Sequence, residues 1–242
     1  MLKTFSVTDI GKKRKLNQDY IYASEEAVGN LPNLFIVADG MGGHKAGDFA
    51  SKCTVETICE LASRSFEKNP VIILKKAIET ANGDVYKKST EDEAYEGMGT
   101  TVVAASCLGK YLQIANVGDS RLYVIGEEIK QITKDHSLVE EMVRMGGINR
   151  EAARNHPDKN IITRAVGADH TVAIDFFSVE LKPMEKVLMC SDGLTNMLED
   201  EEIRMIVQGP GSVEMRAKEL VSAANERGGK DNISVILIEQ TA

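Results

Sequence analysis

The fold is decided by residues 100–133, TTVVAASCLGKYLQIANVGDSRLYVIGEEIKQIT. Short apolar runs in this stretch are separated by turn residues, first at Gly109-Lys110 and again at Gly126-Glu127. A parallel crossover needs a dozen or more residues, so each of these turns can join only antiparallel neighbours. The stretch therefore predicts an antiparallel sheet and disfavours a doubly wound, nucleotide-binding fold.

Amphipathic helices are predicted on both sides of this strand-rich stretch. Asn69 and Pro70 have the form of an N-cap and a first-turn proline, and Gly228-Gly229 closes the last helical pattern before a final strand. Helices packed on antiparallel sheets give an α+β layered sandwich. The helical patterns cover residues 47–66, 70–85 and 213–224.

Composition indicates one compact domain spanning residues 1–242. No Pro/Ser-rich linker divides the chain, and a domain of this length buries roughly 70% of its unfolded surface. Its 29 basic and 37 acidic residues give a net charge of −8. Apart from the short run Lys12, Lys13, Arg14 and Lys15 there is no basic stripe, which argues against a nucleic-acid partner.

Cysteine usage and hydropathy indicate a cytoplasmic enzyme. No stretch approaches the ~20 apolar residues of a membrane span, and the N-terminus lacks the apolar centre of a signal peptide. The cysteines show no zinc-binding spacing and are expected to be reduced residues of the core. They are Cys53, Cys59, Cys107 and Cys190.

Residues 137–166 interrupt the strand pattern. The segment is polar, helix-like at its start, and broken by Gly146-Gly147 and Pro157. Such an insertion is more often a plain surface excursion, yet binding loops occupy the same places in other folds. We interpret it as a candidate substrate flap within the single domain.

Four aspartates stand at the ends of strand-like runs. Asp39, Asp119 and Asp192 follow such runs and each neighbours a glycine, whereas Asp231 precedes the last run. Carboxylates gathered on one rim would raise one another's pKa, and a divalent cation would offset their charge. Any one Asp-Gly pair is also ordinary turn chemistry. Taken together, the pairs predict a metal site.

Seven short motifs make the chain resemble the metal-dependent protein serine/threonine phosphatases of type 2C, the PPM family, in their bacterial form. The motifs run in order through nearly the whole chain, which makes the resemblance specific although each is weak alone. They are GKKRKLNQD at 11–19, VADGMGGH at 37–44, GMGTT at 97–101, NVGDSR at 116–121, DHS at 135–137, CSDGL at 190–194 and GKDN at 229–232.

The resemblance implies an architecture and a metal centre. The fold would be a four-layer α-β-β-α sandwich of two antiparallel sheets flanked by helices, with a small flap insertion. Two Mn²⁺ or Mg²⁺ ions would lie in a cleft at one sheet edge. Asp39 would bridge both ions, the Gly40 carbonyl would bind one of them, and Asp192 with Asp231 would hold the other.

Other residues follow from the same resemblance. Asp19 would act mainly through metal-bound water, Asp119 would bind a third, weaker ion, and Arg14 would bind the substrate phosphate, for which a two-pronged guanidinium is suited. The chain departs from many relatives at Met41, where they carry a histidine proposed to protonate the leaving alkoxide. His44 and a water on the third ion are the two candidates for that acid.

The predicted activity is hydrolysis of phosphoserine and phosphothreonine on proteins. Two cations about 3.5–4 Å apart lower the pKa of a bridging water, so hydroxide can attack phosphorus without a phospho-enzyme intermediate. Phosphoprotein substrates, a cognate bacterial Ser/Thr kinase and a monomeric enzyme are expected.

The sequence disfavours two alternative functions. A non-catalytic relative would have lost the aspartates 39, 192 and 231, and all three are present. A phospho-aspartate enzyme would need an Asp-x-Asp pair, which Ala38-Asp39-Gly40 does not supply. Two histidines, His136 and His156, are predicted to be structural partners of turns or caps, because no metal-binding spacing surrounds them.

Overall fold

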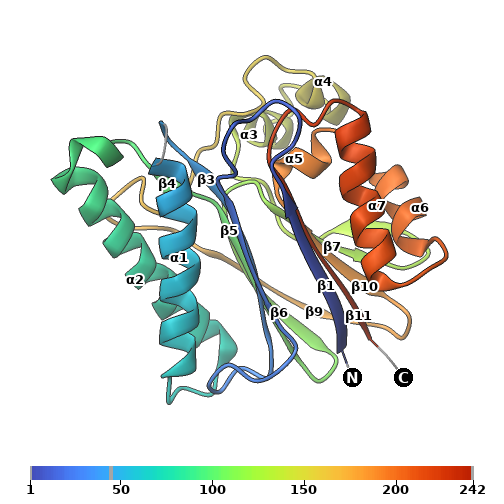
Figure 1. Cartoon of the computed structure of the whole chain (residues 1–242), viewed down its shortest axis with the longest axis horizontal. Coiled ribbons are helices and arrows are strands. Elements are labelled where there is room, and N and C mark those ends of the chain that lie inside the picture. Colours follow the sequence, from blue (N-terminus) through green and yellow to red (C-terminus); the bar gives the residue numbers. More distant parts are fainter. Residues whose placement is uncertain (1, 44–45, 241–242) are drawn as a thin grey trace.

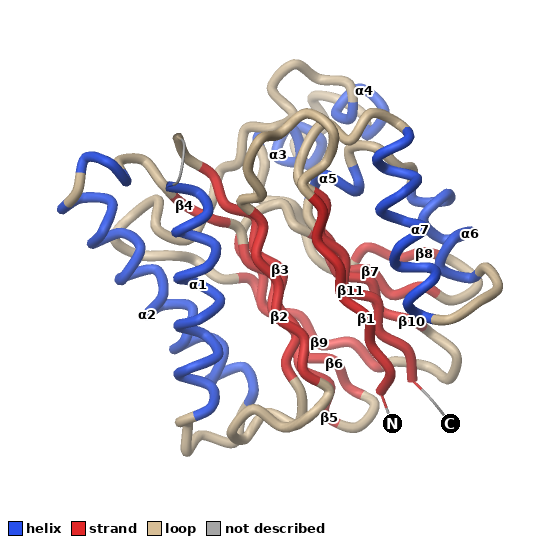
Figure 2. The backbone as a smooth tube through the Cα atoms, in the orientation of Figure 1, coloured by secondary structure: helices blue, strands red, loops and turns tan. Residues whose placement is uncertain are grey.

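The computed structural model describes residues 2–43 and 46–240, which form a four-layer α-β-β-α sandwich (Figure 1). Every strand pair is antiparallel, and Figure 2 shows the two sheets facing each other. The five-stranded sheet runs β1 (Leu2–Asp9), β11 (Ile233–Gln240), β10 (Lys186–Cys190), β7 (Arg121–Ile125) and β8 (Ile129–Gln131). The other runs β2 (Asp19–Ser24), β3 (Leu34–Met41), β5 (Val102–Leu108), β6 (Tyr111–Val117) and β9 (Asp175–Glu180), with β4 (Gly99–Thr100) beside β3. The predicted fold class is confirmed.

Helices cover the outer face of each sheet (Figure 1). On the six-stranded sheet lie α1 (Ala46–Ser63) and α2 (Pro70–Glu91), followed by the 3-10 turn η1 (Glu93–Tyr95). On the five-stranded sheet lie α5 (Asp192–Thr195), α6 (Asp200–Gln208) and α7 (Val213–Glu226). The short helices α3 (Leu138–Arg144) and α4 (Arg150–Arg154) stand above one end of the sandwich.

Three apolar layers hold these elements together. In β11, Ile236 and Ile238 face the layer between the sheets, whereas Val235 and Leu237 face the layer under α5–α7. Alternate residues of a strand point to opposite faces, so a central strand covered on both sides must be apolar at nearly every position. This is why residues 233–238 and 102–107 are apolar at every position except Ser234 and Ser106.

The helix boundaries largely follow the sequence. The Asn69 side chain accepts a hydrogen bond from the Val71 N–H (3.0 Å), which confirms the predicted N-cap. The first helix, expected over 47–66, ends instead at Ser63, and Phe66 lies outside it with 98% of its surface exposed. The cause is a distant residue, because the Asn30 amide donates to the Ser65 and Glu67 carbonyls and holds this segment as a loop.

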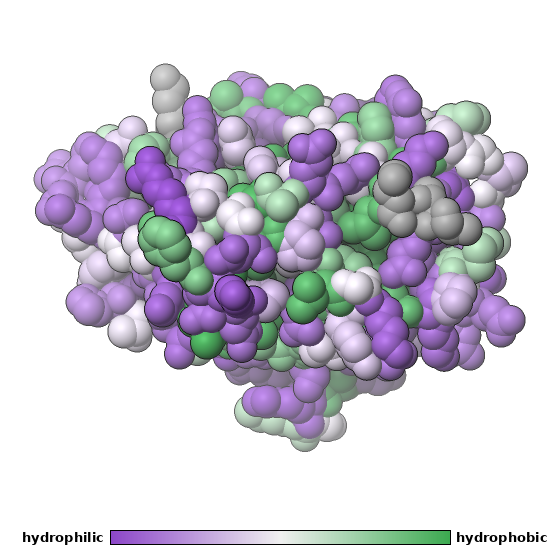
Figure 3. Space-filling model, turned by 90° about the horizontal axis from the view of Figure 1, so that it is seen from below, coloured by the Kyte–Doolittle hydropathy of each residue, from purple (hydrophilic) through white to green (hydrophobic). Residues whose placement is uncertain are grey.

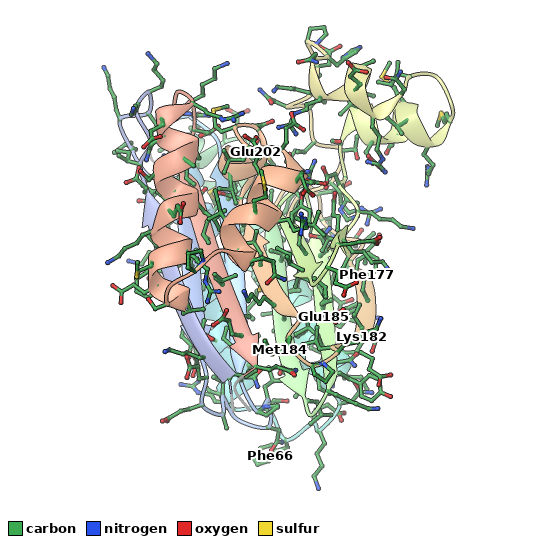
Figure 4. The ribbon with its side chains drawn as sticks, turned by 90° about the vertical axis from the view of Figure 1, so that its right-hand side faces the viewer. Phe66, Phe177, Lys182, Met184, Glu185 and Glu202 are labelled. Carbon is green, nitrogen blue, oxygen red and sulfur yellow. The ribbon has the colours of Figure 1, made fainter. Side chains whose placement is uncertain are left out.

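Residues 137–166 leave the sandwich and return to it through one narrow neck. Ser137 pairs with Ile162, and the Leu138 N–H donates to the Ile161 carbonyl (2.9 Å). Residues 138–162, which include α3 and α4, form a projecting segment that stands out from the body and is drawn in pale yellow in Figure 4. The role of this segment as a substrate flap stays a prediction.

Nothing in the described part of the chain resembles a transmembrane helix, since no helix there combines sufficient length with sufficient apolar character. Figure 3 shows the end of the molecule opposite α3 and α4, where the surface is mostly hydrophilic and apolar residues are scattered.

A pair of phenylalanine substitutions tests the core. Phe35 is fully buried between the sheets, so Phe35→Ala should lower the free energy of unfolding by about 3–5 kcal/mol in urea titrations. Phe66→Ala removes the same atoms from the exposed loop at the lower end of Figure 4. It should change the free energy of unfolding by less than about 0.5 kcal/mol. Equal losses in the two variants would contradict this packing.

Candidate functional site

Five aspartates from different elements converge on one rim between the two sheets. Asp19 opens β2 and lies directly opposite Asp39 on β3. Asp192 begins α5, Asp231 precedes β11, and Asp119 lies in the connection from β6 to β7. A pocket of about 210 Å³ is lined by Asp39, Asp119, Asp192 and Asp231 and has Arg14 at its edge. The structure thus brings the sequence-predicted carboxylates together.

Burial dominates the electrostatics of this rim. It raises the pKa of Asp39 well above its usual range, and the negative charges of Asp19 and Asp192 add to the effect. Burial likewise raises the pKa of Asp19 to about 7, although hydrogen bonds from Ser234 and Ser191 oppose it. The pKa of Asp119 is also raised, mainly by burial and then by the charge of Asp192. The carboxylates lack enough positive charge around them.

Arg14 supplies part of that charge, and the neutral Asn196 amide adds a hydrogen bond. Arg14 Nη2 lies 2.7 Å from Asp231 Oδ2, and the Asn196 amide donates to Asp192 Oδ2 at 2.8 Å. Burial and the charge of Asp231 nevertheless raise the pKa of Asp192 to about 6. Oδ1 of Asp19 and Oδ1 of Asp192 are buried, and no residue in the described ranges donates a hydrogen bond to either.

The carboxylates do not form a closed cage. Within residues 2–43 and 46–240, no three histidine, cysteine or acidic side chains are arranged closely enough to hold an ion by themselves. One oxygen of Asp192 and one of Asp231 are already bonded to Asn196 and Arg14. The donor set is all oxygen, which suits hard divalent cations such as Mg²⁺ and Mn²⁺.

Gly40 can lie in the rim because its strand approaches α1 very closely. A Cβ at Gly40 would come within 2.0 Å of the Gly47 carbonyl oxygen. The Gly40 N–H donates to the Gln18 carbonyl (3.0 Å), which fixes the β3 backbone beside the loop that carries Arg14. Only glycine fits this position.

Several functional contacts escaped the sequence reasoning. The Asn232 amide donates to the Ile10 and Leu16 carbonyls and accepts from the Gln18 N–H, so it fastens the loop containing Arg14 to β11. Ser191 donates to Asp19 at 2.7 Å. The sequence marked Asn232 and Ser191 only by their positions in the GKDN and CSDGL motifs, next to the predicted metal ligands Asp231 and Asp192.

The proposed general acid cannot be located relative to the pocket. His44 lies outside the described residues, whereas Met41 lines the pocket. Asn160 and Ile162, at the end of the projecting segment, line its opposite wall.

A second cavity of about 570 Å³ adjoins the pocket and shares Asp119 and Asp192 with it. It lies between the projecting segment and the start of α6. Arg154 on α4 crosses this cavity, with Nε 2.7 Å from the Glu199 carboxylate and Nη2 donating to the Leu198 carbonyl (2.9 Å). This ion pair and the hydrogen bond to Leu198 therefore tie α4 to the body of the molecule.

Known proteins resemble the chain over its full length. The sequence model of protein phosphatase 2C matches residues 11–237. "Serine/threonine phosphatase stp" of Listeria monocytogenes is 39% identical over 244 residues, covering 96% of this chain and 94% of the relative. The crystal structure of serine/threonine phosphatase Stp1 from Staphylococcus aureus has a TM-score of 0.94 at 36% identity, covering 100% of this chain and 96% of that one. The catalytic domain of PstP, solved with two manganese ions, has a TM-score of 0.87 at 32% identity, covering 98% and 97%.

The raised pKa of Asp19 predicts how the chelator-treated protein responds to pH. Because its folded pKa of about 7 exceeds the unfolded value of about 4, the stability linked to this group is fully present below pH 4 and is lost as the pH rises through 7. At about 1.4 kcal/mol per pKa unit, the free energy of unfolding should fall by a few kcal/mol across this window. Urea unfolding at several pH values measures the fall.

Asp19→Asn should flatten this dependence because it removes the titrating carboxyl. Asp84→Asn, on the exposed side of α2, is the matched control and should follow the parent protein. If the free energy of unfolding of Asp19→Asn fell with pH as steeply as that of the parent protein, Asp19 would not have the raised pKa described here.

Proposed function

The chain belongs to the protein phosphatase 2C family and is a serine/threonine protein phosphatase, and from this premise we propose how its own residues carry the reaction. It hydrolyses phosphoserine and phosphothreonine on proteins without a phospho-enzyme intermediate, as a cytoplasmic monomer opposing a cognate Ser/Thr kinase. The observation that carries the proposal is the convergence of Asp39, Asp192 and Asp231, more than 190 positions apart at the extremes, on one buried pocket.

The oxygen donors of the rim suit a pair of Mn²⁺ or Mg²⁺ ions. Asp39 would bridge them, the Gly40 carbonyl would bind one, and Asp192 with Asp231 would hold the other. The buried, unpartnered Asp192 Oδ1 and the raised pKa values support this assignment, because cations would supply the missing positive charge. When bound, such a pair ionises water near neutral pH and offsets the charge of the phosphate oxygens.

Two further carboxylates complete the proposed metal site. Asp119 would hold a third, weaker ion at the border between the pocket and the larger cavity, whose walls it shares. Asp19 would act through water, since Ser191 already donates to its Oδ2. The manganese ions of the PstP structure support a metal of this class here.

Arg14 would exchange partners during the reaction. Its guanidinium now bonds Asp231 and is half-exposed at the mouth of the pocket. When Asp231 holds a cation instead, Arg14 would be free to bind two oxygens of the substrate phosphate. The proton for the leaving alkoxide would come from His44 or from water near Asp119.

The deciding experiment counts metal ions and measures phosphate release from a phosphothreonine peptide with and without chelator. Chelation should abolish release, and Asp39→Ala or Asp192→Ala should lower it by at least about 10³-fold while the fold is retained. Asp84→Ala is the control and should keep the activity of the parent protein. Full activity in the Asp39→Ala, Asp192→Ala double variant would refute the proposal.

The projecting segment would select phosphoprotein substrates. It forms one wall of the cavity beside the catalytic pocket. Residues flanking a phosphoserine can lie in this cavity, whereas a small aryl phosphate has no flanking residues to occupy it. Opening the wall requires breaking the Arg154–Glu199 pair.

Exchange of residues 146–160, or Arg154→Ala alone, should change kcat/KM for phosphopeptides by about tenfold while that for a small aryl phosphate changes less than about twofold. Arg144→Ala is the matched control, because Arg144 in the last turn of α3 is exposed and lines neither the cavity nor the pocket. Equal changes for both substrate types would mean that the segment is only structural.

A further inference from the structure

His136 clamps one end of the turn that carries Asp119. The Gly118 N–H donates to His136 Nδ1 (3.0 Å), and the His136 backbone N–H donates to the Gly118 carbonyl (3.0 Å). Both polar groups of Gly118 are therefore bound by the same residue, 18 positions along the chain. The side chain of His136 is 7% exposed, so water competes little with these bonds.

The turn itself has little freedom. It carries the chain from β6 in one sheet to β7 in the other, and Gly118 has a φ of +103°. A Cβ on Gly118 would come within 2.6 Å of the Thr101 side chain. On the far side of Asp119, Ser120 Oγ shares a hydrogen bond with Thr101 Oγ1 (2.8 Å), and Thr101 Oγ1 accepts the Asp39 N–H (3.0 Å). The Asp119 backbone is thus fixed by hydrogen bonds at both neighbours.

The contacts of the imidazole define its tautomer. Because Nδ1 accepts a backbone N–H, the ring proton of the neutral form must lie on Nε2. Nε2 is 3.3 Å from Asp175 Oδ2, which can accept that proton's hydrogen bond. Nε2 also lies 3.1 Å from Arg164 Nη1, and with the proton on Nε2 that guanidinium nitrogen donates to the Ala173 carbonyl and to Asp175 instead of to the ring. Arg164 Nη1 in turn donates to Asp175 Oδ1 at 2.8 Å and holds the carboxylate in place. Burial and the charge of Arg164 lower the pKa of His136, which favours the neutral ring that Nδ1 acceptance requires.

We propose that His136 is a positioning residue for catalysis: with its Nε2–H tautomer fixed by Asp175, it orients the Gly118 peptide and so directs the Asp119 carboxylate toward the pocket. This goes beyond the structural role that the sequence predicted for His136. It rests on the proposed role of Asp119 as a metal ligand. The ring acts on the site only through the backbone and touches neither substrate nor cation.

Two amide substitutions separate the functions of the two ring nitrogens. In His136→Asn the amide oxygen can take the place of Nδ1, whereas in His136→Gln the amide lies near the place of Nε2 and leaves the Gly118 N–H without an acceptor. Both side chains are polar and similar in size. Both variants also keep the backbone bond to Gly118 and the bond from the Thr163 N–H to the His136 carbonyl (2.8 Å). The comparison therefore isolates the acceptor at Nδ1.

The first measurement uses the metal-free full chain. Hydrogen exchange of the Gly118 amide, followed by NMR, should accelerate in His136→Gln and stay near the parent rate in His136→Asn. The second is Mn²⁺ titration by calorimetry and kcat for an aryl phosphate. His136→Gln should weaken the weakest Mn²⁺ class and lower kcat by about 10–100-fold, the usual cost of losing an outer partner of a metal ligand, and His136→Asn should recover most of both.

His156→Gln is the matched control. His156 Nδ1 also accepts a backbone N–H, from Asp158 at 3.2 Å, but within the projecting segment and away from Gly118. It should leave Mn²⁺ binding and aryl phosphate turnover unchanged.

The outcomes distinguish this inference from the proposed function. Equal behaviour of His136→Asn and His136→Gln in exchange, Mn²⁺ binding and kcat would overturn the positioning role. If Asp119→Ala leaves Mn²⁺ binding unchanged, the metal role of Asp119 fails instead. In that case a Gly118 amide that exchanges faster only in His136→Gln would still support the clamp.

Discussion

The burial of several carboxylates at one rim is the constraint on which this structure depends. Asp19, Asp39, Asp119 and Asp192 all have pKa values raised first of all by burial. The charges of Arg14 and Arg121 lower the pKa of Asp192 without cancelling the effect of burial. Such an arrangement persists only if the surrounding scaffold holds it, because an unpaired buried charge strongly destabilises a fold. Any cation that binds the folded form would relieve this strain and stabilise the protein.

The scaffold meets that demand with three apolar layers and a few long-range polar ties. The layers fix the register of the strands, so that Asp19 and Asp39 must lie side by side. Asn232 ties the N-terminal loop to β11, and Thr101 joins the backbone at Asp39 to the turn beyond Asp119. Groups held this way reorganise little when charge develops, which is the condition for electrostatic catalysis.

The projecting segment is built on a different principle. It meets the body at a narrow neck and at the Arg154–Glu199 pair, whose Glu199 side is largely exposed. An exposed ion pair stabilises by less than about 1 kcal/mol, so this contact can be exchanged at little cost. The rigid rim and the weakly held segment thus suit the separate tasks of reaction and substrate selection.

Much of the fold and of the candidate site could be predicted from local features of the sequence. Apolar periodicity and short turns gave the antiparallel strands, Asn69 gave a helix start, and the Asp-Gly pairs marked the rim, because these features depend on neighbours in the chain. Tertiary structure alone decided that Arg14 bonds Asp231, 217 positions away, that Asn30 ends α1 early, and that His136 clamps Gly118. A hydrogen bond depends on the distance between two groups in space and not along the chain. The periodicity of apolar residues therefore does not identify the partner of a polar side chain.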